Sequence, residues 1–454
     1  MATRSGKPRR PRWVIILCLV LAVVFIVVLS AYLYIRPLLR TGTGYAAHNL
    51  CAVTEIAGRT DATEDLPTNP LVPFLAQYKN GGYSYVNVLG LLAGQTAYYT
   101  EGLGCTISPR RPDFDPPEQV GKGQLLREEP QLDPALDDAI GRAFGDHLPD
   151  DEAKALGTRG IVVVKDGMIV GERYADGFTS STPQLGWSMT KSVANLLTGR
   201  AVQQGVISID DSALRPEWTD SRRDITVDHL MRMTSGIEWD EEYDLGTPIT
   251  TMLFDADNMA DYVAGLPIGQ DPGNYQQYSS GSTNLLCSVL NERLESGPHM
   301  PREQLFAPLG LASAVLEPDA SGTPVCSSYL WATPRDWARI GQFVLDDGVV
   351  GGERLLPEGW VEESTTVKQI PAEDPGEYDD EGAGYAASWW TNLRGDGELA
   401  HESLPRDAFW AQGHDGQRMY VLPSENVVVV RMGFTPVSRD LELIQLLEAV
   451  TAGP

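Results

Sequence analysis

The segment Ser188-Met189-Thr190-Lys191 has the residue types and spacing that most directly suggest chemistry in this 454-residue chain. Residues three apart on a helix share a face, so the Lys191 amine can reach the Ser188 hydroxyl. A serine needs a neighbouring base to act as a nucleophile, and a lysine can serve when burial lowers its pKa. The pattern predicts a nucleophile with its own base. The alternative is a Ser188 that only caps a helix and a solvated Lys191.

The surroundings of Ser188 favour the start of a helix. Gly186-Trp187 is a plausible turn, and an apolar-periodic run from Val193 to Val202 follows. The first turn of a helix has free backbone N–H groups and the positive end of the helix dipole, which favour a developing oxyanion. We therefore expect the amide of Ser188 to be one oxyanion donor.

A second polar segment, residues 272–281, joins a Pro-Gly turn to a helix near residues 285–290. It would place Tyr278 and Ser280 at the corner between loop and helix. A nearby lysine ammonium favours the ionised form of a phenol, and a phenolate is a competent general base. The alternative is a structural tyrosine that covers the helix end.

A third segment, Gly413-His414-Asp415-Gly416-Gln417, comes directly before the expected strands 418–422 and 427–432. Glycines at the entry to a strand let a substrate lie close to the backbone. The amide of Gln417 can then supply a second oxyanion donor beside that of Ser188. The alternative for His414 is a turn histidine whose ring is satisfied locally.

In this order, Ser-x-x-Lys, Tyr-x-Ser and His-x-Gly resemble the motifs of the penicillin-recognising serine hydrolases. The chain is most similar to the class C β-lactamase-like branch, with its esterases, D-stereospecific peptidases and 6-aminohexanoate-dimer hydrolases. The likeness extends over about residues 160–431. The segments that carry it are Trp187–Ser192, Leu230–Gly236, Pro308–Gly310, Ala332–Arg339 and Gly413–Gln417.

The resemblance implies an α/β (α+β) fold of the β-lactamase/transpeptidase type, an antiparallel sheet flanked by helices with an inserted helical lobe. The order of expected elements agrees, since strands occur near 160–174 and 385–432 with helices between them. It also implies an acyl-enzyme on Ser188 without metal or cofactor. The implied site residues are Ser188, Lys191 and Tyr278 for catalysis, and Ser188, Gln417, Ser280, His414 and Gly416 for oxyanion and substrate binding.

Three departures from β-lactamases bear on the substrate. His414 and Asp415 replace the Lys and Thr of the third motif, and Ser280 replaces the usual Asn of the second. A histidine of ordinary pKa is mostly neutral at pH 7 and holds a β-lactam carboxylate poorly. We expect an ester or amide of a small molecule or peptide instead. The aromatic residues that could set specificity, or else pack in the core, are Trp239, Tyr243, Trp389, Trp390 and Trp410.

The N-terminus predicts a membrane anchor. Residues 1–12 carry five basic residues and no acid, and Trp13–Ile35 is an uncharged apolar run of 23 residues. Such a run spans about 35 Å as a helix, enough to cross a bilayer. The basic flank places the N-terminus in the cytoplasm and the rest of the chain outside the cell membrane. The alternative is a cleaved signal peptide, with Val28-Leu29-Ser30 as a passable cleavage site.

Composition and charge divide the remaining chain and limit its partners. We expect a tail at 1–12, an anchor at 13–35, a membrane-proximal region at 36–130 and the hydrolase domain at 131–454. Within the membrane-proximal region, 45–58 and 96–107 look strand-like. The net charge of −27 argues against nucleic-acid partners. In an oxidising compartment Cys51 would pair with Cys105, and Cys287 could pair with Cys326.

A second function from a different class stays open at this point. A catalytically silent envelope protein could bind cell-wall material through the same cleft, although it would have no need of Ser188, Lys191 and Tyr278. A Ser-His-Asp hydrolase finds no support, because the chain has no Gly-x-Ser-x-Gly segment. Oligomeric state and substrate identity are not given by the sequence.

Overall fold

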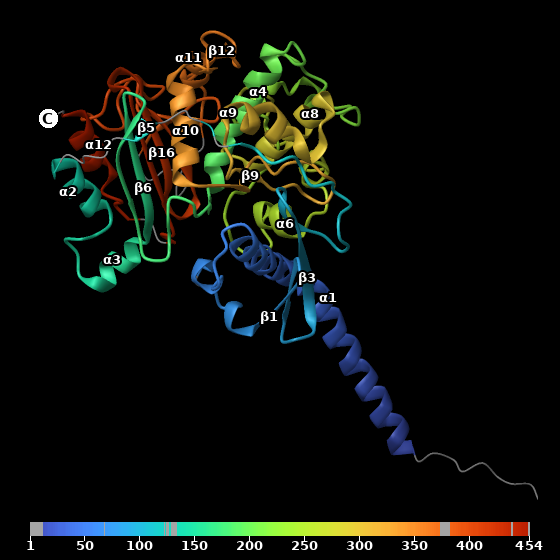
Figure 1. Cartoon of the computed structure of the whole chain (residues 1–454). Helices are drawn as coiled ribbons and strands as arrows, with labels where there is room; N and C mark the ends of the chain where they lie inside the picture. Colours follow the sequence, from blue (N-terminus) through green and yellow to red (C-terminus); the bar gives the residue numbers. More distant parts are fainter. Residues whose placement is uncertain are drawn as a thin grey trace, which may run out of the picture.

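The computed structural model describes residues 12–67, 69–121, 123, 127–128, 134–372, 382–436 and 439–452. Its centre is an eight-stranded sheet in the order β13-β14-β15-β16-β17-β6-β7-β5, antiparallel except for the short β5 beside β7 (Figure 1). The strands are β5 (Arg127–Glu128), β6 (Thr158–Lys165), β7 (Met168–Tyr174), β13 (Gly384–Tyr385), β14 (Trp390–Thr391), β15 (Phe409–Gly413), β16 (Gln417–Leu422) and β17 (Val427–Gly433).

Alternating side chains bury both faces of this sheet, as period-two strands require. Val162 and Val428 belong to the core on the side of α10 (Pro334–Leu345). Val163 and Val429 belong to a second core that also contains residues of α2 (Pro134–Ala143) and α12 (Leu443–Thr451). The sheet is thus a middle layer between helices, and the predicted fold is confirmed.

A helical lobe is inserted between β7 and β13, as predicted. It contains the helix that follows Ser188, α4 (Thr190–Gln203), and the helix that begins at Ser280, α8 (Ser280–Leu294). The other elements of this stretch are β8 (Gln184–Leu185), α5 (Val227–Met231), α6 (Pro248–Asp255), α7 (Met259–Ala264), α9 (Ala307–Leu309), β9 (Val315–Leu316), β10 (Leu330–Ala332), β11 (Val349–Val350), β12 (Glu353–Arg354) and α11 (Trp360–Thr365).

The N-terminal apolar run is the first part of a much longer helix, α1 (Arg12–Glu55). The expectation of a strand at 45–58 is therefore wrong for residues 45–55. Thr43, Ala47 and Cys51 recur at every fourth position and are all buried, which is the stripe of a helix packed on one face. The segment contains a tyrosine and β-branched residues, which favour strands, but its packing in the folded chain makes it a helix.

A separate antiparallel sheet of four strands packs beside α1 (Figure 1). Its strands are β1 (Leu75–Asn80), β2 (Tyr83–Val88), β3 (Leu92–Thr100) and β4 (Gly104–Ile107). The predicted strand at 96–107 is in fact a hairpin, because the segment turns at residues 101–103. A disulfide joins Cys51 of α1 to Cys105 of β4, as predicted.

A buried carboxylate joins this N-terminal part to the part of the chain built around the eight-stranded sheet. Glu317 is fully buried and accepts hydrogen bonds from the backbone N–H of Cys105 and from Nε1 of Trp331 at 2.6 and 3.0 Å. The ring of His48, on α1, lies 2.7 Å from the same carboxylate. Since an unpaired buried carboxylate is costly, these contacts fix α1 and β4 against that part of the chain.

Candidate active site

Ser188 lies where the sequence places it, in a 3-10 turn (Trp187–Met189) that leads into α4. Trp187 has a φ of 48°, an uncommon left-handed conformation for a tryptophan. Strain of this kind persists where the surrounding fold imposes it, often at functional sites. It presents Ser188 as a partly exposed residue between the buried Trp187 and Met189.

Lys191 is buried one turn later, and its amine has three hydrogen-bond partners. Nζ lies 2.8 Å from Ser188 Oγ, 2.8 Å from Ser280 Oγ and 3.2 Å from the carbonyl oxygen of Ser327. Burial lowers the pKa of Lys191 from 10.5 to about 8, against an opposing effect of Glu241. The amine is therefore partly deprotonated near neutral pH.

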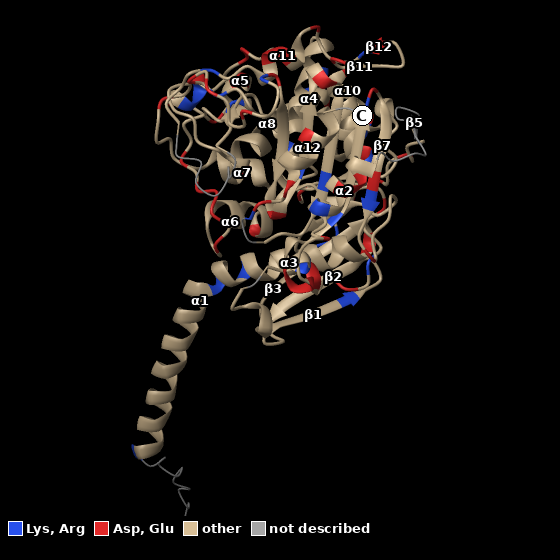
Figure 2. Cartoon of the chain, turned by 90° about the vertical axis from the view of Figure 1, so that its left-hand side faces the viewer, with Lys and Arg blue, Asp and Glu red and all other residues tan. Residues whose placement is uncertain are grey.

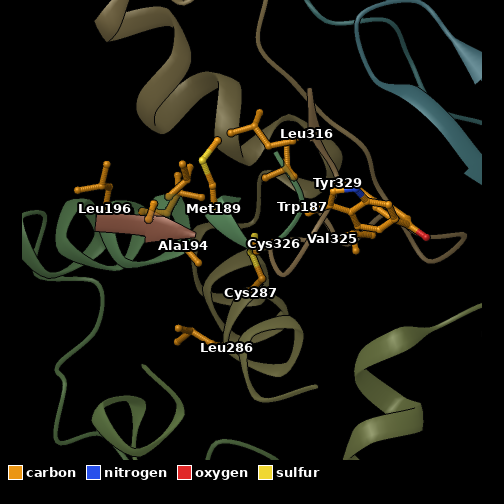
Figure 3. Close-up of a cluster of buried hydrophobic side chains, with 14 of the residues drawn as sticks. Trp187, Met189, Ala194, Leu196, Leu286, Cys287, Leu316, Val325, Cys326 and Tyr329 are labelled. Carbon is orange, nitrogen blue, oxygen red and sulfur yellow. A yellow bond between two sulfur atoms is a disulfide. The ribbon is translucent and has the colours of Figure 1, made fainter. Parts of the chain in front are cut away.

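The carbonyl of Ser327 is held by a neighbouring disulfide. Cys326 is bonded to Cys287 of α8, which confirms the second expected pairing. Figure 3 shows these two cysteines within the buried cluster that also includes Trp187 and Met189. The core beneath the site thus connects the Ser188 turn, α8 and the segment that carries Ser327.

Glu241 is a buried site residue that the sequence did not identify. Its carboxylate accepts hydrogen bonds from the hydroxyl and the backbone N–H of Ser280, the latter at 2.8 Å, and from Nε1 of Trp239. One of its oxygens lies 3.9 Å from Lys191 Nζ. The carboxylate therefore fixes the start of α8 and places a negative charge behind the Lys191 amine.

Tyr278 lies beside the amine, with the centroid of its ring 4.9 Å from Lys191 Nζ. Its ring stacks on Trp390 at 5.6 Å and meets the edge of Tyr385 at 5.4 Å. The second motif thus brings both Tyr278 and Ser280 to Lys191. The structure defines the position of the ring, while a role for the hydroxyl remains a prediction.

The third motif reaches the Ser188 turn through a close approach of two glycines. A Cβ on Gly413 would lie only 2.2 Å from the carbonyl oxygen of Gly186. This contact requires glycine at position 413 and places the turn His414–Gly416 beside the Ser188 turn. The His414 ring lies 5.7 Å from the Trp187 ring and stacks on Tyr243 at 4.5 Å.

The other members of this motif shape the turn. Asp415 is buried with a φ of 59°, and Oδ1 lies 3.5 Å from His414 Nε2. Burial raises the pKa of Asp415, while His414 lowers it. The Gln417 side chain pairs with the backbone of Gly433 through bonds of 2.7 and 2.9 Å. Gly416 packs so closely on Arg431 that a Cβ would lie 2.5 Å from Nη1.

The exposed face of the site is formed by side chains from four segments. Ser188, Tyr243 and Tyr278 are partly exposed and His414 is exposed, whereas Lys191 beneath them is buried. For the four tryptophans considered for specificity the structure favours the core alternative, since all are buried: Trp239, Trp389, Trp390 and Trp410. Among the described residues, no three metal-ligating side chains converge on one point.

Comparison with known proteins agrees with this geometry. A family model described as Beta-lactamase matches residues 149–444. The chain is 25% identical over 320 residues to the 6-aminohexanoate-dimer hydrolase of Paenarthrobacter ureafaciens, a match that covers 65% of this chain and 77% of that protein.

Solved structures share the fold at lower identity. A provisionally named 6-aminohexanoate-dimer hydrolase from Bacillus anthracis aligns with a TM-score of 0.58 and 21% identity, over 74% of this chain and 88% of that one. A family VIII carboxylesterase aligns with a TM-score of 0.54 and 16% identity, over 71% of this chain and 99% of that one.

Proposed function

The chain belongs to the beta-lactamase family of serine hydrolases, and we propose that it cleaves an ester or amide bond through an acyl-enzyme on Ser188. The contact of 2.8 Å between the buried Lys191 amine and the Ser188 hydroxyl carries this proposal. The departures at Ser280, His414 and Asp415 favour a small ester, amide or peptide over a β-lactam. The names of the similar proteins, a dimer hydrolase and a carboxylesterase, point to the same bond types.

The hydrogen bonds around Lys191 support its role as the base. The Ser327 carbonyl can only accept, and the Ser280 hydroxyl already donates its proton to Glu241. A neutral amine has two N–H groups, which these two acceptors take. Its lone pair is then left for the Ser188 proton. Tyr278 completes the proposed relay and passes the proton to the leaving group.

The remaining groups would bind the substrate. The backbone N–H groups of Ser188 and Gln417 are proposed as the oxyanion donors, each worth about 3–4 kcal/mol in comparable sites. Support comes from the close approach of Gly413 to Gly186, which puts the third motif beside the nucleophile. Ser280 orients Lys191, while His414 and Gly416 line the acyl side. Water then hydrolyses the acyl-enzyme.

We further propose that α1 is an uncleaved anchor and that the hydrolase domain lies outside the cell membrane. Within the described part of the chain, α1 is the one helix long and apolar enough to cross a membrane. In Figure 2 its outer part carries no acidic residue, in contrast to the rest of the molecule. The two disulfides fit an oxidising compartment.

The test is covalent labelling of the purified full chain in detergent. In the wild type, a fluorophosphonate probe should phosphonylate Ser188 with loss of fluoride, and a short-chain p-nitrophenyl ester should acylate it with release of p-nitrophenolate. Ser188→Ala should stay unmodified by both. Mass spectrometry of the labelled peptide identifies the residue. Full turnover by Ser188→Ala would end the assignment, and ligand binding without labelling would favour the silent envelope protein.

A further inference from the structure

The four-stranded sheet beside α1 has one apolar end. Outside α1, four large apolar residues of the described chain have exposed side chains, and all lie in a strand of this sheet or in a turn beside one: Phe74, Tyr78, Leu89 and Leu91. Three of them gather where β2 turns into β3, because the Leu89 N–H donates to the carbonyl of Phe74. Phe74, Leu89 and Leu91, here called the apolar tip, are 55, 68 and 81% exposed.

The sequence of this region is depleted in charge. From Leu66 to Thr100 the single charged residue is Lys79, in a chain in which 21% of residues are charged. Lys79 lies at the opposite end of the sheet, beside the β1–β2 turn, and pairs with Glu55 at the end of α1. The apolar tip thus has no charged neighbour along this stretch.

The apolar tip lies level with the end of the apolar run of α1. The Tyr32 hydroxyl contacts the backbone N–H of Ala93, two residues from Leu91, at 3.1 Å. Tyr32 lies within the run, three residues or about 5 Å before its end at Ile35. Figure 1 shows the sheet against α1 where the helix leaves the body of the molecule.

We propose that the apolar tip inserts into the outer interface of the same bilayer that α1 crosses, as a second membrane contact. The proposal rests on the anchoring proposed above. Exposed apolar clusters mark protein or membrane contacts. Lipid is the favoured occupant here, because a helix in the membrane holds the apolar tip at the depth where hydrocarbon begins. An aromatic side chain such as Phe74 suits that interface.

The experiment measures the depth of single fluorescent labels in vesicles. Full-length protein is reconstituted in phosphatidylcholine–phosphatidylglycerol vesicles with or without brominated lipid, which quenches a fluorophore that it touches. Leu91→Cys, in a Cys18→Ser background, carries an NBD label, and Leu89→Cys is a second site. The matched control is Asn80→Cys, on the same sheet at its far end. Native Cys18, labelled in the wild type, reports on α1.

The proposal expects NBD emission at positions 91 and 89 to shift to the blue and to fall at least about twofold with brominated lipid, with no change at position 80. Quenching at Cys18 without quenching at 91 and 89 overturns the second contact and leaves the anchor in place. Absence of quenching at Cys18 overturns both. A blue shift at 91 without bromine quenching assigns the apolar tip to a protein partner or a second copy and overturns the lipid contact.

Discussion

Lys191 donates to the hydroxyl of Ser280 at 2.8 Å, and that hydroxyl donates in turn to the buried Glu241. In the proposed mechanism, the Ser280 hydroxyl and the Ser327 carbonyl accept the two N–H groups of the neutral amine, which leaves its lone pair for the Ser188 proton. This chain of donors also places a carboxylate close enough to influence the charge of the base.

The rate of acylation should depend on the ionisation of Lys191. Burial lowers its pKa to about 8, and the amine acts as a base only when neutral. We therefore expect kcat/KM to rise with pH, to reach half of its maximum near pH 8 and to fall about tenfold per pH unit well below it. The measurement is a pH–rate profile with a p-nitrophenyl ester, with the Ser188→Ala rate subtracted. A flat profile from pH 6 to 9 would exclude Lys191 as the base.

Glu241→Gln should change both the rate and this profile. The negative charge of Glu241 raises the pKa of Lys191, so its removal moves the rising limb of the profile below pH 8. The amide nitrogen of a glutamine cannot accept a hydrogen bond, so one of the two hydrogen bonds from Ser280 at the start of α8 is lost. We expect kcat to fall as a result. Glu242→Gln, at the exposed neighbouring residue, is the control. If the rising limb of the pH–rate profile of Glu241→Gln stays at the wild-type pH, Glu241 does not control the pKa of Lys191.

Tyr278→Phe removes the hydroxyl of Tyr278 and keeps its ring. The ring packs on Trp390 and Tyr385, and phenylalanine keeps these contacts. If the hydroxyl transfers a proton, kcat should fall at least about a hundredfold with little change in thermal stability. Stopped-flow acylation and a melting curve measure the two effects. Wild-type turnover would leave Tyr278 as a packing residue beside Lys191.

Gly413→Ala should disrupt the junction between the first and third motifs. The added methyl would lie 2.2 Å from the Gly186 carbonyl, so the backbone of one turn must move. We expect a lower Tm and at least a tenfold loss of kcat/KM, because the turn that carries His414 shifts away from Ser188. Gly121→Ala, where an added Cβ meets no atom within 4 Å, is the matched control. Equal Tm and activity in the two variants would contradict this role.

The sequence was most informative where the chemistry is local. Ser188 and Lys191 are three residues apart on adjoining helical turns, so their contact follows from helix geometry alone. Glu241 could not be chosen, because Glu238, Asp240 and Glu242 surround it and only tertiary packing shows which one is buried. The helix over residues 45–55 was missed for a related reason, since its pattern makes sense only with the four-stranded sheet beside it.

Ala93 is held by residues on both sides of Pro37 in α1. Pro37 lies inside α1; Tyr32, before it, contacts the N–H of Ala93, and Thr43, after it, donates to the carbonyl at 2.6 Å. Further along the helix, the Tyr45 ring stacks on that of Trp187, the residue before Ser188. With α1 in a bilayer, the sheet would keep the two parts of the helix on either side of Pro37 in a fixed arrangement. Ser188 would then stay at a constant distance from the membrane surface. Tyr45 lies ten residues, about 15 Å of helix, beyond Ile35. The site would therefore act on molecules that come within about this distance of the membrane surface.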